Sequence, residues 1–238
     1  MDTRLAFEIL PQPDSETCGP TCLHAVYRYF GDEMPLARVI AECDRLEEGG
    51  TLAVLLGCHA LRRGYDAAIY TYNLQVFDPT WFYPKPQPLA EKLTAQMAVK
   101  DFPKLHVASR GYLDFLALGG EIRMRDLSRA LIREHLNNSI PILTGLSATY
   151  LYNEPREFGP RWEPDDVRGV PAGHFVVLCG YDRANKQVHI ADPYQQNPLG
   201  AERLYSVGVD RAINAILLGI LTYDANLLVI QPRKPRKR

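Results

Sequence analysis

The sequence has no long uninterrupted hydrophobic run. Its best apolar stretches, residues 52–58 and 215–221, are far shorter than the roughly 18 residues that a membrane-spanning helix needs. The first ten residues include Asp2, Arg4 and Glu8, which interrupt any signal-peptide core. We therefore expect a cytoplasmic protein with no membrane partner.

The chain also lacks an excess of either charge. Its 27 Lys and Arg face 28 Asp and Glu, which leaves a formal net charge of -1. Such a balance excludes the domain-wide basic field that binds nucleic acid, so we expect no nucleic-acid partner. The one basic cluster, residues 233–238, is typical of a disordered, solvated tail. A partner must therefore be recognised at a local site.

Cysteines are few and odd in number. In a chain with no secretory signal, five scattered cysteines argue against a disulfide framework. Cys22 follows Cys18 by four residues but lacks the second pair that a zinc site needs, so we expect no metal and no cofactor. The others lie in apolar runs and are expected to be buried: Cys43, Cys58 and Cys179.

Hydrophobic periodicity predicts helices first and strands later, which is the pattern of an α+β fold. We expect one domain over residues 1–232. Helices are predicted over 18–30, 36–46, 51–63, 89–99, 124–136 and 209–218. Strands are predicted over 67–72, 140–146 and 227–231, with an antiparallel hairpin that turns at 183–185 and an aromatic, proline-rich loop at 77–88.

Cys18 lies at the start of the first predicted helix. Free backbone N–H groups and the helix dipole there favour the thiolate, which is the form of cysteine that attacks a carbonyl. Gly19 leaves the backbone open for a substrate carbonyl. Gln12 precedes Cys18 by six residues, and its amide could join the Cys18 N–H in stabilising an oxyanion.

A nucleophilic thiol needs a base, and the base needs an orienting group. His174 begins the first strand of the predicted hairpin and Asp192 ends the second. A turn near residue 184 places 174 opposite a residue near 194, so Asp192 is diagonal to His174 on one face. The alternatives are a structural strand-end histidine and an Asp-Pro turn.

Six residues occur in the chain order of a known family: Gln12, Cys18, Gly19, Gly173, His174 and Asp192. In this order and spacing they resemble the papain-like C39 peptidases, over residues 10–31 and 140–193. The resemblance implies a helical N-terminal half that carries the cysteine, packed on an antiparallel β half that carries the histidine and aspartate. It implies that Cys18 is the nucleophile, His174 the base, Asp192 its orienting group and Gln12 an oxyanion donor.

The sequence thus predicts a cysteine peptidase or amide hydrolase that acts on a peptide or amide through a thioester. The alternatives are a transpeptidase or acyltransferase with the same triad, and a catalytically idle peptide-binding module. Substrate contacts are predicted for Gly19, Gly173, Trp81 in the aromatic loop, and Trp162 in a lid over 150–172. The alternative for 150–172 is a mobile surface loop. Without transporter domains, the chain resembles the stand-alone C39-like branch. Some members of that branch accompany ATP-grasp ligases, so the resemblance suggests a functional link to such a ligase.

Overall fold

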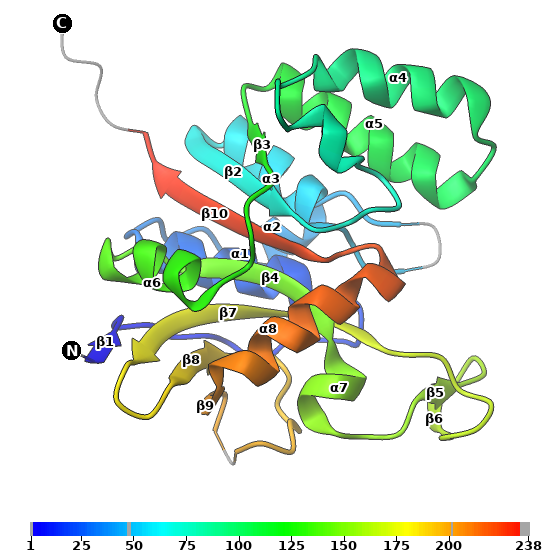
Figure 1. The fold of residues 1–238 in the computed structure, drawn as a ribbon. Coiled ribbons are helices and arrows are strands. Elements are labelled where there is room, and N and C mark those ends of the chain that lie inside the picture. Colours follow the sequence, from blue (N-terminus) through cyan, green and yellow to red (C-terminus); the bar gives the residue numbers. More distant parts are fainter. Residues whose placement is uncertain (1, 47–48, 201, 234–238) are drawn as a thin grey trace, which may run out of the picture.

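One mixed sheet runs through the protein (Figure 1). The computed structural model describes residues 2–46, 49–200 and 202–233. Within them the sheet has eight strands in the order β3-β2-β10-β4-β7-β8-β9, and β1 also pairs with β7. The strands are β1 (Asp2–Arg4), β2 (Tyr65–Thr71), β3 (Glu121–Arg123), β4 (Ile142–Ser147), β7 (Gly173–Asp182), β8 (Gln187–Ala191), β9 (Leu204–Gly208) and β10 (Asn226–Pro232). Neighbours are antiparallel except β2 and β3, which are parallel.

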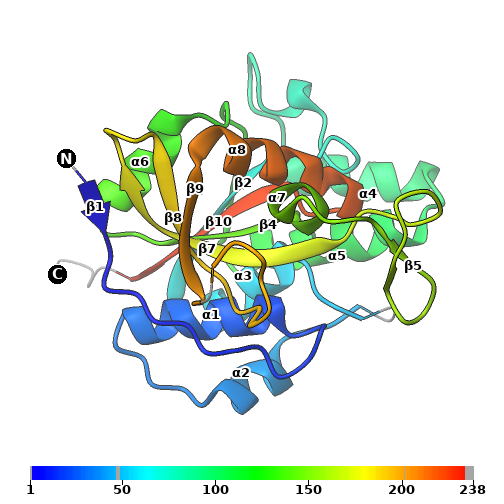
Figure 2. The same ribbon diagram turned by 90° about the horizontal axis from the view of Figure 1, so that it is seen from below.

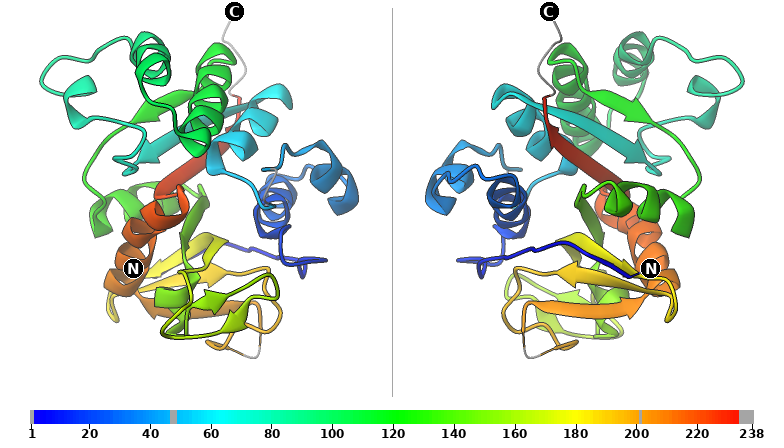
Figure 3. Two further views of the ribbon diagram at one scale, coloured as in Figure 1. Left: turned by 90° about the vertical axis from the view of Figure 1, so that its right-hand side faces the viewer. Right: turned by 90° about the vertical axis from the view of Figure 1, so that its left-hand side faces the viewer.

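Helices cover both faces of this sheet (Figure 2). On one face lie α1 (Cys18–Tyr29), α2 (Leu36–Glu42) and α3 (Ala53–Arg62), and on the other lie α6 (Arg129–Asn137), α7 (Ala148–Tyr152) and α8 (Val209–Leu218). A further pair, α4 (Leu89–Val99) and α5 (Pro103–Ala117), packs together beside α3 (Figure 3). Four short elements complete the fold: β5 (Glu157–Phe158), β6 (Glu163–Pro164), η1 (Pro79–Trp81) and η2 (Gly219–Thr222).

The core extends over both faces of the sheet, and the part that positions the site lies between the sheet and α1. Residues 19–27 of α1 are all buried, and its apolar side chains packed in the core, next to β4 and β7, include Cys22, Leu23 and Val26. This burial, rather than intrinsic propensity, stabilises a helix of this length. The packing fixes the start of α1 next to the start of β7.

The fold confirms the predicted α+β class and differs from the prediction in several details. β2 comes from the N-terminal half yet joins the same sheet as the C-terminal strands, between β3 and β10. The helix predicted over 124–136 begins only at Arg129, because the side chain of Ser128 accepts a hydrogen bond from the N–H of Leu131 and caps it.

Helix α5 was not predicted from the sequence. Gly111 in its centre disfavours an isolated helix. In the fold, however, a Cβ at residue 111 would lie 3.0 Å from Val54, so the glycine lets α5 approach α3 closely. A tertiary contact therefore explains a residue that looks unfavourable in sequence.

Two further predictions concern the chain ends and the membrane. Of the basic tail predicted over 233–238, residues 234–238 lie outside the described residues. Arg233 is described, and its Nε lies 3.1 Å from Oδ1 of Asp66. Among the helices of the described part of the chain, none is long and apolar enough to cross a membrane.

Candidate active site

Helix α1 begins at Cys18, as the sequence predicts. The N–H of Thr21 donates to the carbonyl of Thr17 (3.0 Å), so the helical ladder starts just before Cys18. The N–H groups of the first turn have no acceptor within the helix and point outward as donors. All five cysteines are described, and Cys18 is half-buried while the other four are buried. Cys18 is therefore the accessible thiol.

His174 and Asp192 are brought together by the β7–β8 hairpin. Val177 pairs with Ala191, and the same register continued along the strands places residue 174 opposite residue 194. Nε2 of His174 lies 2.8 Å from Oδ1 of Asp192. The Cys18 thiol interacts with the same imidazole, and Nδ1 is the ring nitrogen left to it.

This environment favours the protonated imidazole. Burial alone would lower the pKa of His174, but the charge and hydrogen bond of Asp192, together with Cys18, raise it to about 10. Burial would likewise raise the pKa of Asp192, but the charge of His174 and three side-chain hydrogen bonds hold it below its usual value. The two side chains thus form an imidazolium–carboxylate pair beside the thiol.

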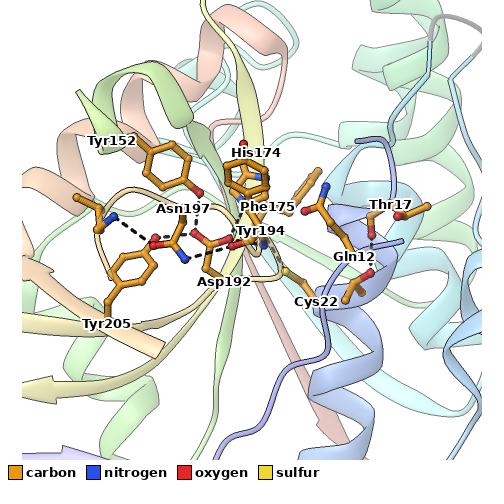
Figure 4. A network of polar contacts seen from close by, with 12 residues as sticks. Gln12, Thr17, Cys22, Tyr152, His174, Phe175, Asp192, Tyr194, Asn197 and Tyr205 are labelled. Carbon is orange, nitrogen blue, oxygen red and sulfur yellow. Dashed lines mark hydrogen bonds and ion pairs between the residues drawn. The ribbon is translucent and has the colours of Figure 1, made fainter. Parts of the chain in front are cut away.

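The carboxylate of Asp192 is fully buried and accepts four hydrogen bonds (Figure 4). Oδ1 accepts from His174 Nε2 and from the N–H of Tyr194 (2.9 Å). Oδ2 accepts from the hydroxyl groups of Tyr152 and Tyr205, both at 2.6 Å. Neither tyrosine is predicted from the sequence, because they lie on α7 and β9 and no spacing relates them to Asp192.

Gln12 lies beside this pair. Its backbone N–H donates to the carbonyl of Pro193 (3.0 Å), which ties the N-terminal segment to the residue after Asp192. Its side-chain Nε2 donates to the carbonyl of Asp14 (2.7 Å). An amide nitrogen carries two hydrogens, so a second one is left for another acceptor. Figure 4 shows the side chain next to the start of α1.

Close packing explains the two glycines near the site. A Cβ at Gly19 would lie 2.6 Å from Thr51 Cγ2 and 3.2 Å from both Leu56 and Phe175. A Cβ at Gly173 would lie 2.8 Å from the hydroxyl oxygen of Thr222. A side chain at either position would therefore have to displace a neighbouring threonine.

The two tryptophans are not brought to Cys18, His174 or Asp192 by any described contact. Trp81 lies in η1, where its ring packs edge-on against Phe77 with centroids 6.3 Å apart. Trp162 lies between β5 and β6, is 56% exposed and has a φ of 55°. Their substrate contacts and the lid over 150–172 stay predictions. No cluster of three or more His, Cys, Asp or Glu within the described residues could hold a metal ion.

Residues 108–212 match the family model described as the Peptidase_C39 like family. The resemblance to the C39-like peptidases is confirmed. The matched segment contains His174 and Asp192, whereas Gln12 and Cys18 precede it. No curated protein sequence matches the chain.

The chain is also similar to solved structures. A crystal structure described as a C39-like peptidase from Bacillus anthracis matches 99% of this chain and 100% of its own, with a TM-score of 0.51 and 14% identity. Xylellain, a cysteine protease from Xylella fastidiosa, matches 98% of this chain and 86% of its own, with a TM-score of 0.46 and 14% identity. At such identity, the first of these matches shows a common fold alone.

Proposed function

We propose that this protein is a cysteine peptidase or amide hydrolase in which Cys18 attacks the carbonyl carbon of a peptide or amide. The observation that carries the proposal is the buried pair of His174 and Asp192 beside an accessible thiol at a helix start. A thiol, a base that interacts with it and a group that orients the base form the arrangement used in nucleophilic catalysis.

In this mechanism the thiol proton of Cys18 resides on His174, which is the imidazolium described above, and the sulfur attacks the carbonyl carbon as a thiolate. The negative charge on the carbonyl oxygen is stabilised by the Cys18 N–H and by the free hydrogen of the Gln12 amide. Collapse of this intermediate breaks the C–N bond while His174 gives its proton to the leaving amine. Water, deprotonated by His174, then attacks the thioester and releases the acid and the free thiol.

The proposal is tested by incubating the protein with a mixed peptide library and analysing both peptides and protein by mass spectrometry. We expect cleaved peptides and an acyl adduct on Cys18. Cys18→Ala should abolish both, whereas the control Cys43→Ala, which removes a buried thiol elsewhere, should keep them. Unchanged cleavage in Cys18→Ala would contradict the proposal.

The same experiment separates hydrolysis from acyl transfer. The triad does not choose between water and an amine as the second nucleophile. Candidate amines are therefore added, and condensed products would indicate a transpeptidase or acyltransferase. Peptide binding without turnover, unaffected by alkylation of Cys18, would indicate a binding module instead. The link to an ATP-grasp ligase stays a prediction.

A further inference from the structure

Asp192 carries a negative charge although its side chain is shielded from water. The residue is fully buried, and a carboxylate removed from water is stable only where charged partners or hydrogen-bond donors replace the water. His174 supplies a charge, but its hydrogen bond reaches Oδ1 only. The other oxygen, Oδ2, depends on different groups.

Two tyrosine hydroxyl groups donate hydrogen bonds to Oδ2. Tyr152 is the last residue of α7 and Tyr205 lies in β9, and both hydroxyl groups donate to Oδ2 at 2.6 Å. Both residues are nearly buried, at 7% and 8% exposed. Figure 4 shows both rings turned toward the carboxylate of Asp192. Two elements far apart in the chain thus converge on one oxygen atom.

The remaining ionisable neighbours cannot take over this role. His174 from β7 and Tyr194 act on Oδ1, the latter through its backbone N–H. Cys22 from α1 is fully buried, and its thiol hydrogen-bonds the carbonyl of Phe175 at 3.3 Å instead. The described donors to Oδ2 are therefore Tyr152 and Tyr205.

We propose that Tyr152 and Tyr205 are positioning residues that keep Asp192 ionised and directed at His174, and thereby set the lowest pH at which Cys18 is reactive. This inference rests on the proposed function. Burial, together with the negative charge of Asp192, raises the pKa of both phenols, so both stay protonated donors throughout the working range. Replacing either by Phe removes one donor while keeping the ring.

Loss of a tyrosine hydroxyl group should raise the pKa of Asp192. Without a donor on Oδ2, the carboxylate of Asp192 is less stable and takes up a proton at a higher pH. His174 then loses its charged partner, and the thiolate of Cys18 loses the imidazolium. The loss of one charge-assisted hydrogen bond to a carboxylate corresponds to an increase of about one unit in the pKa of that carboxylate.

The test measures the rate at which iodoacetamide alkylates Cys18 over a range of pH, by mass spectrometry of the Cys18 peptide. We expect the acidic limb of the profile to move up by about one pH unit in Tyr152→Phe and in Tyr205→Phe, and further in the double variant. The matched control is Tyr27→Phe, because the Tyr27 hydroxyl is also buried and hydrogen-bonded, to Nδ1 of His59 at 2.8 Å. It should keep the wild-type profile.

The outcomes separate this inference from the proposed function. If wild-type Cys18 reacts no faster than an ordinary thiol, the proposed function fails. If wild-type Cys18 is highly reactive but both Phe variants keep its profile, the role of the tyrosines is wrong. If the acidic limb of the alkylation profile moves equally in Tyr27→Phe, the role of the two tyrosines is also wrong, because a general loss of stability would then be the cause. Circular dichroism confirms folding, and either single variant suffices for the test.

Discussion

The carboxylate of Asp192 lies 2.8 Å from Nε2 of His174, although 18 residues separate them in the chain. The β7–β8 hairpin produces this contact, and the pairing register of its two strands changes along their length. Near the turn Gly180 pairs with His189, a register that would place residue 174 opposite 195. Beyond a bulge between Leu178 and Gly180 the register shifts by one residue, and 174 falls opposite 194. Since a shift of one residue exchanges the two faces of a strand, the bulge helps to aim His174 at Asp192.

The first prediction concerns the contribution of His174 to stability. Its pKa is raised to about 10 in the folded protein, against roughly 6.5 in an unfolded chain. The folded state therefore binds the proton more tightly. The resulting stabilisation is complete below about pH 6.5 and is lost as the pH rises toward 10.

Urea denaturation of the wild type and His174→Gln at several pH values measures this contribution. The free energy of unfolding of the wild type should exceed that of the variant most at mildly acidic pH, and the difference should shrink as the solution becomes alkaline. His106→Gln, on α5, serves as the control. A difference that grows with pH would show that the ion pair is not formed as described.

The second prediction concerns Gln12. If its amide stabilises the oxyanion, Gln12→Ala should lower kcat on a cleaved peptide by about a hundredfold, which is typical for the loss of one oxyanion donor. Alkylation of Cys18 should change little, because iodoacetamide forms no carbonyl oxyanion. Gln87→Ala is a matched control, since Gln87 also donates its side-chain amide to a nearby backbone carbonyl, that of Lys85. Equal kcat in both variants would exclude the role.

The third prediction concerns Asp224, a buried acid outside the triad. Burial raises its pKa to about 7, against the opposing effect of hydrogen bonds from Asn226 and from the N–H of Ala53 at the start of α3. The unfolded chain releases this proton near pH 3.9, so the stabilisation is present below about pH 3.9 and is lost as the pH rises through 7.

Asp224→Asn removes this titration and keeps an oxygen for the Ala53 N–H. Its free energy of unfolding should rise relative to that of the wild type between pH 4 and 7, by at least about 1 kcal/mol. Thermal denaturation at the two ends of this range measures the difference. A difference that does not depend on pH would mean that the acid is already ionised at low pH in the folded protein.

The parts of the site that local patterns determine could be predicted from the sequence. The start of α1 at Cys18 follows from helical periodicity, and the meeting of His174 with Asp192 follows from the length of one hairpin. The bulge in that hairpin was not predicted, because no glycine or proline pattern marks it uniquely. Tyr152 and Tyr205 were missed for a stronger reason, since only the tertiary fold brings α7 and β9 to the same carboxylate.

The most direct test of the central claim compares the alkylation of Cys18 by iodoacetamide at mildly acidic pH with that of glutathione, an ordinary thiol. If His174 and Asp192 activate Cys18, it should react at least tenfold faster than glutathione, because an adjacent imidazolium favours the reactive thiolate form of a cysteine. His174→Gln should remove this advantage while the protein stays folded. A wild-type Cys18 that reacts no faster than glutathione would contradict the account.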